Sequence, residues 1–171
     1  MAELLLWREE LQQAYHNPLF DVPQPTLNLG HIHGGDNPNR ICGHCELQID
    51  IRPLPGMALS ELRLELEQRL HKTLAGSMID YRTVALFDGV PAVETPADSR
   101  LVKAAEQLTG AGAQAVAFST EAPFYNQLGI DSVVLGPGHI EQAHQPDEFL
   151  AMEQIKPTIK LIQDLVKEFC M

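Results

Sequence analysis

The chain has 171 residues, with 12 basic and 23 acidic side chains and a formal net charge of −11. Apolar residues make up 44% and charged residues 20%, a composition typical of a folded protein with one ordinary domain or two small ones. No apolar run approaches the ~20 residues of a membrane span, and no basic stripe offsets the acidity, so we expect neither membrane nor nucleic-acid binding.

The first third of the chain alternates helical and strand patterns. Residues 1–16 place leucines among charged residues at helical spacing and predict an amphipathic helix. Residues 26–33 predict a strand with Leu27, Leu29, His31 and His33 on one face. Residues 41–52 alternate more strictly and predict a second strand, antiparallel to the first across a glycine-rich turn.

A second helix and a further strand complete this region. Ser60 is the expected N-cap of a leucine-rich helix that ends at Gly76, and residues 78–87 predict a strand. Helix, two strands, helix and strand in this order predict most of an α+β split βαβ arrangement of the ferredoxin-like type, lacking its first strand. We therefore expect one domain over residues 1–87.

Residues 88–97 predict a linker, after which the pattern becomes α/β. Asp98 or Ser99 is expected to cap a helix, a short helix follows Thr120, and a last helix covers about residues 152–169. Between them, two apolar segments predict buried strands of a sheet covered on both faces, residues 114–118 and 132–135. We expect residues 88–171 to form this second part.

The three cysteines are too few for a disulfide scaffold, which favours a reducing, cytoplasmic location. Cys42 and Cys45 enclose a Cys-Gly-His-Cys motif that also occurs in thiol–disulfide oxidoreductases. A reactive thiol of that class needs a helix N-terminus, whereas this motif opens a predicted strand. The favoured interpretation is two small apolar strand residues, and a dithiol redox protein remains an alternative.

Polar side chains follow the apolar segment at 132–135, at the edge of a sheet where α/β proteins bind ligands. His144 is there a candidate metal ligand, with Asp147 and Glu148 as its partners or as caps of the last helix. His33, at a strand end beside a glycine turn, could donate to a developing oxyanion or bond a backbone carbonyl. Glu121 precedes a short helix and could simply favour its dipole.

Six blocks of the chain form a recognisable series: Thr26–Asp36, Asn39–Cys42, Asp50–Met57, Phe118–Phe124, Leu135–Gly138 and Ala143–Glu148. In this order they resemble the acetylornithine deacetylase family of dinuclear metallohydrolases (M20-type peptidases). The resemblance covers nearly the whole chain and implies most of a lid, or dimerisation, domain followed by the C-terminal part of a catalytic α/β domain.

The resemblance also implies roles for individual residues. His144 matches the last metal-ligand histidine of the family, and His33 matches the lid histidine that steadies the oxyanion in the partner subunit's site. Gly136 and Gly138 match the loop lining the substrate pocket, and Glu121 falls at a polar position of that pocket. Asn39, in the turn beyond the histidine, is implied to contact the substrate. The family's other metal ligands and its catalytic glutamate have no counterpart here.

The implied reaction is hydrolysis of N-acetyl-L-ornithine to L-ornithine and acetate for arginine biosynthesis, with two zinc or cobalt ions. We expect a homodimer through the lid and a small acylated amino acid as substrate. One histidine cannot hold two ions, so we expect the isolated chain to be inactive and metal-free. Succinyl-diaminopimelate desuccinylase activity and a non-catalytic dimerisation or interaction module are the alternatives.

Overall fold

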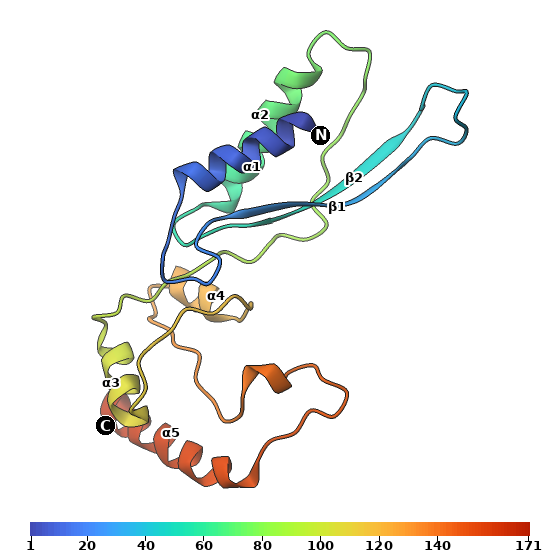
Figure 1. Ribbon diagram of the computed structural model, residues 1–171. Coiled ribbons are helices and arrows are strands. Elements are labelled where there is room, and N and C mark those ends of the chain that lie inside the picture. Colours follow the sequence, from blue (N-terminus) through green and yellow to red (C-terminus); the bar gives the residue numbers. More distant parts are fainter. The chain divides into compact units, whose positions relative to one another are not determined.

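The computed structural model describes residues 1–171, which form two compact units. Unit 1 comprises Met1–Glu94 and Ala115–Ser119, and unit 2 comprises Thr95–Gln114 and Thr120–Met171. Unit 1 holds helix α1 (Ala2–Ala14), strands β1 (Thr26–Gly34) and β2 (Cys45–Arg52), and helix α2 (Leu59–Leu74). This mixture of helices with a small antiparallel sheet confirms the predicted α+β class (Figure 1).

The core of unit 1 lies between the two helices and the hairpin. On α1, Leu4, Trp7 and Leu11 recur at three- and four-residue intervals, so they share one face of the helix, and all three are buried. They pack with buried residues from β1, the β2–α2 connection and α2, namely Leu27, Leu54, Met57 and Leu62. Of the leucines that predicted the two helices, Leu4, Leu11 and Leu62 share this core.

A bulge in β1 changes which face of the hairpin carries the histidines. Leu29 pairs with Ile49, but His31 pairs with Gln48, so Gly30 is the extra residue. Leu29 and Ile49 pack against the core, whereas His31 and His33 share the other face. The prediction that all four alternate positions of residues 26–33 lie on one face is wrong, because the bulge reverses the alternation.

The connection between the strands is longer than expected. β2 begins at Cys45, and residues 41–44 belong to the turn, where the Cys42 thiol donates to the His44 carbonyl over 2.9 Å. The prediction that the strand begins at Ile41 is therefore wrong, as is the placement of Cys42 in a strand. Both Cys42 and Cys45 are exposed, free thiols.

Helix α2 also starts differently from the prediction. Its N-cap residue is Ala58, which makes no side-chain cap, and Ser60 lies inside the first turn. Ser60 is therefore not the cap. The helix ends at Leu74, followed by Gly76 at a φ of +77°, a backbone conformation that glycine adopts at little cost.

One arginine on α2 ties the two helices of unit 1 together. Arg69 donates to the carboxylate cluster Glu3, Glu10 and Glu65, at 2.9 Å for Glu3 and for Glu65, and its guanidinium lies 5.7 Å from the centre of the Trp7 ring. Burial by itself lowers the pKa of Arg69, but the hydrogen bonds that its guanidinium donates to these carboxylates outweigh this effect, so the pKa is raised.

Unit 2 consists of helices α3 (Arg100–Thr109), α4 (Ala122–Gln127) and α5 (Ile155–Cys170), with short 3₁₀ turns η1 (Ile140–Gln142) and η2 (Met152–Gln154). The predicted cap is confirmed, since the Ser99 hydroxyl accepts the Val102 N–H over 3.3 Å. α3 contacts α5, where Arg100 bonds Glu168 at 3.0 Å and lies over the Phe169 ring.

Three predicted strands do not form: residues 78–87, 114–118 and 132–135. A strand needs a neighbour for its backbone N–H and C=O groups, and within the structure only β1 and β2 pair. At Ser132 a side chain replaces the missing strand neighbour. The Ser132 N–H donates to the hydroxyl of Thr95, and that hydroxyl donates to the Ser132 carbonyl. Apolar side chains in these segments remain exposed, among them Leu86 at 78%.

None of the helices combines the length and the apolar character that crossing a membrane requires.

Candidate functional site

The hairpin of unit 1 presents His33 near the end of β1, on the outer face created by the bulge. Its Cα partner on β2 is Glu46, and its ring lies 6.4 Å from the ring of His31, centre to centre, with 16° between the planes. His33 is exposed. Because no core residue covers the imidazole, it is free to act on a group brought to this end of the hairpin.

Asn39 lies in the turn beyond the histidines. Its backbone N–H donates to the Asn37 side-chain oxygen over 3.2 Å, and Arg40 pairs with Asp36 at 2.9 Å in the same turn. These bonds shape the turn through neighbouring residues and leave the exposed Asn39 amide available. An amide of this kind can both donate to and accept from a polar ligand.

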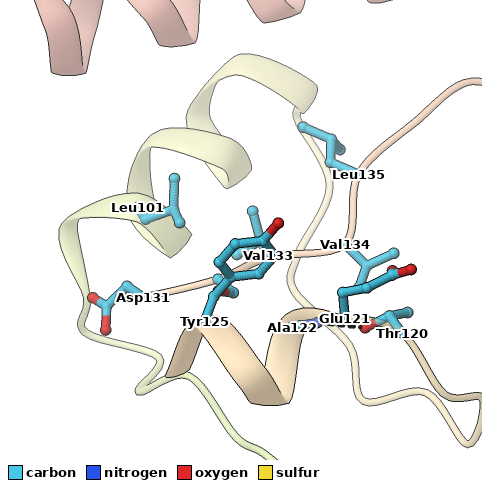
Figure 2. Close-up of a pocket in the computed structure, with 10 residues that line it drawn as sticks. Leu101, Thr120, Glu121, Ala122, Tyr125, Asp131, Val133, Val134 and Leu135 are labelled. Atoms are coloured by element: carbon cyan, nitrogen blue, oxygen red, sulfur yellow. Dashed lines mark hydrogen bonds between the residues drawn. The ribbon is translucent and has the colours of Figure 1, made fainter. Parts of the chain in front are cut away.

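Unit 2 contains an open pocket of about 500 Å³ built around helix α4 (Figure 2). Half of its lining residues are apolar, and its polar side chains include Glu121, Thr120, Tyr125 and Asp131. Thr120 accepts the Ala122 N–H over 3.1 Å, which fixes the start of the helix. The remaining lining residues are Leu101, Ala122, Ser132, Val133, Val134 and Leu135.

Two carboxylates give this pocket its charge. Figure 2 shows Tyr125 between Asp131 and Glu121, with the phenol ring inside the pocket. Such an arrangement suits a cationic or hydrogen-bond-donating ligand with an apolar stem. The sequence reasoning found Glu121 but missed Asp131 and Tyr125. The signal for Asp131 was its place immediately before an apolar segment.

The loop after Leu135 carries the two predicted pocket glycines. Gly138 has a φ of +95°, which a side chain would strain, and a Cβ there would meet Leu150 at 3.6 Å. A Cβ on Gly136 would meet nothing within 4 Å. Gly138 therefore has a backbone reason to be glycine, whereas Gly136 is left with open space beside it.

His144 has a backbone φ of +62°, the only positive value in this structure outside glycine. Its N–H donates to a carboxylate oxygen of Glu148 over 3.0 Å, and its imidazole is exposed. Glu148 therefore orders the main chain of this loop and does not cap α5, which begins at Ile155. A non-glycine residue held at positive φ stores about 1–3 kcal/mol and is typical of functional loops.

The structure divides the six predicted site residues between its two units. His33 and Asn39 lie in unit 1, and Glu121, Gly136, Gly138 and His144 lie in unit 2. Of the latter, Glu121 lines the pocket, and Gly136 follows its lining residue Leu135. No group of three or more His, Cys, Asp or Glu side chains assembles into a metal-binding cluster.

Residues 1–77 match the family model described as peptidase dimerisation domain. The chain is 50% identical over 170 residues to an acetylornithine deacetylase of Edwardsiella ictaluri. This match covers 99% of the chain and 44% of the relative. Identity is 48% to the acetylornithine deacetylase of Pectobacterium carotovorum and 44% to that of Photorhabdus laumondii, with the same 44% of each relative covered.

These comparisons confirm the resemblance that the sequence blocks indicated, including the dimerisation domain in the first part of the chain. The chain spans less than half the length of the curated relatives it matches.

Proposed function

We propose that this chain acts, together with residues outside these 171, as part of an amide hydrolase that converts N-acetyl-L-ornithine to L-ornithine and acetate in arginine biosynthesis. The observation that carries the proposal is the 50% identity, along 99% of the chain, to a relative named acetylornithine deacetylase. The chain covers 44% of that relative, so residues outside the match would supply the rest of the site.

Within this proposal, His33 donates a hydrogen bond to the oxygen that becomes negative as the amide carbonyl is attacked. Its exposed position at the end of β1 supports that role, since a substrate can reach it. We assign substrate contacts to Asn39, Glu121 and the loop of Gly136 and Gly138. The carboxylate of Glu121 would attract the amino group of an ornithine derivative.

We assign one metal-ligand position to His144. The strained backbone of this residue and its N–H bond to Glu148 support a loop shaped to present the imidazole. The donors of this chain do not by themselves fit a two-metal centre, because no cluster of three forms. Two zinc or cobalt ions would therefore depend on residues outside these 171, and we expect the isolated chain to bind neither ion at His144.

We further propose that residues 1–87 form the dimerisation domain of a cytoplasmic homodimer and that residues 88–171 belong to the catalytic domain. The match of residues 1–77 to the peptidase dimerisation domain supports the first part. The unpaired segment at 132–135 supports the second, since Val134 and Leu135 are exposed there and a strand neighbour from outside these residues would cover them.

Complementation tests the proposal. The chain is co-expressed with the part of the Edwardsiella ictaluri relative that lies outside the match, and hydrolysis of N-acetyl-L-ornithine is measured with added zinc or cobalt. We expect activity from the pair and none from either part alone. His33→Ala should lower kcat by about 10²–10³, as loss of an oxyanion donor does, and His144→Ala should abolish metal-dependent activity.

The same assay separates the alternatives. Faster turnover of N-succinyl-diaminopimelate than of N-acetyl-L-ornithine would assign the related desuccinylase activity. A stable complex without hydrolysis of any acylated amino acid would favour a non-catalytic interaction module. The double variant Cys42→Ser/Cys45→Ser should retain hydrolysis. Neither thiol lies at a helix N-terminus, so the structure gives the dithiol redox alternative no support.

A further inference from the structure

The outer face of the hairpin brings two imidazoles side by side. His31 and His33 are two residues apart on β1, so strand alternation puts both side chains on the same face, about 6.6 Å apart along the strand. Their rings are nearly parallel, at 16°, with centres 6.4 Å apart. Both residues are exposed, so binding by either ring requires no unpacking of the core.

The separation of the rings is within reach of one metal ion once the side chains turn toward it. A Zn–N bond of about 2.1 Å places an imidazole centre about 3.2 Å from the ion, so two rings on one ion have centres at most about 6.4 Å apart. The observed separation lies at that limit, and the rings are stacked, so their nitrogens do not yet point at a common ion. Both side chains are exposed, and binding would require rotation about their side-chain bonds to bring the nitrogens together.

The second strand adds polar groups to the same face. Glu46 is the cross-strand partner of His33, and Gln48 is the partner of His31. Side chains of such partners have their Cβ atoms about 4.5–5.5 Å apart. Gln48 donates to a Glu46 carboxylate oxygen over 2.7 Å, which holds this negative charge beside the imidazoles. The face thus offers nitrogen ligands and a compensating charge.

We propose that His31 and His33 bind a divalent transition-metal ion such as Ni²⁺, Cu²⁺ or Zn²⁺, with Glu46 as the neighbouring carboxylate and water in the remaining positions. Imidazole nitrogen is a preferred ligand of these ions. The pair is an open, two-ligand site, consistent with the lack of any cluster of three or more donors. The pair lies in unit 1, whereas His144, the metal position assigned above, lies in unit 2.

A consequence follows for hydrolysis, and it rests on the proposed function. An ion held by the pair occupies a nitrogen of His33, which then cannot donate to an oxyanion. Excess transition metal would thereby inhibit the enzyme through the hairpin.

Calorimetric titration of the 171-residue chain with Ni²⁺ alone tests the binding. The cysteines are first replaced in a Cys42→Ser/Cys45→Ser/Cys170→Ser background, so that thiols do not compete for the ion. His31→Asn and His33→Asn should each weaken binding about tenfold or more, and Glu46→Gln by less. The matched control His71→Asn, an exposed histidine on α2, should leave the affinity unchanged. Trp7 fluorescence confirms that each variant is folded.

Unchanged affinity in both His31→Asn and His33→Asn would overturn the proposal, as would a loss of binding that follows His44→Asn or His144→Asn instead. This titration needs no hydrolysis, so its result stands whether or not complementation succeeds. In a complemented, active enzyme, inhibition by Ni²⁺ relative to each variant's own activity should require about tenfold more metal in His31→Asn. Equal inhibition would overturn the link to His33 and leave the binding result intact.

Discussion

The core of unit 1 predicts a large stability difference between two leucines on one helix. Leu11 is 5% exposed and belongs to the cluster around Trp7, whereas Leu6 on the same helix α1 is 54% exposed. Leu11→Ala removes Cγ and both Cδ atoms from the core. At about 0.8 kcal/mol for each carbon group, the lost burial alone costs about 2 kcal/mol, and the cavity raises the expected cost to about 2–5 kcal/mol.

The change is measured by urea unfolding followed by the fluorescence of Trp7, the sole tryptophan of the chain. Leu6→Ala makes the same chemical change on the same helix, and we expect it to shift the free energy of unfolding by no more than about 0.5 kcal/mol. Equal destabilisation by the two variants would refute the assignment of Leu11 to the core. The slope of the transition should stay constant, since neither variant alters the surface exposed on unfolding.

Three further predictions follow from contacts elsewhere in the molecule. Arg69→Met should destabilise unit 1 by about 1–2 kcal/mol in urea unfolding, because the carboxylate cluster loses its cation. In 1 M NaCl we expect a smaller loss of unfolding free energy, since salt screens the repulsion among the three remaining carboxylates. Asp164 accepts hydrogen bonds from Lys160 and Lys167, and these bonds, with the lysine charges, hold the pKa of Asp164 below its ordinary 3.8; Lys160 has the largest effect. The stabilisation of α5 by this carboxylate is therefore present above that pH and is lost as the pH falls through the lowered pKa. In an NMR titration of Lys160→Met, we expect the pKa of Asp164 to rise. Gly34→Ala should destabilise the hairpin by about 1–3 kcal/mol in thermal unfolding, because the added Cβ would lie 2.6 Å from the backbone oxygen of His44. Gly43→Ala is the matched control, since its Cβ would meet nothing within 4 Å, and we expect it to be neutral.

The sequence was most informative where a pattern is complete within one element. The apolar spacing in residues 1–16 predicts helix α1, observed at Ala2–Ala14, because its buried residues repeat with the helical period. The alternation in residues 26–33 predicts a strand but not the bulge, which moves the histidines to the other face. An isolated glycine in a strand is a known bulge signal, so Gly30 was the available warning.

Features that depend on distant parts of the chain could not be predicted in the same way. Residues 78–87 and 132–135 have strand-like composition, but composition does not show whether a neighbouring strand is present to pair with them. The positive φ of His144 likewise depends on the Glu148 carboxylate and the loop around it. The candidate site was therefore found as a set of residue types, and the missing information was which of them the fold brings together.

The two units differ in how much core their own residues provide. In unit 1, the apolar stripe of α1 is buried against the hairpin and α2, with Trp7 fully covered. In unit 2, α5 carries an equally regular stripe, but Ile159, Ile162 and Val166 are each about half exposed. Since an amphipathic helix gains most of its stability by burying its apolar face, unit 1 can account for its own folding. Unit 2 needs a further apolar surface, which the proposed function assigns to the part of the hydrolase outside these residues.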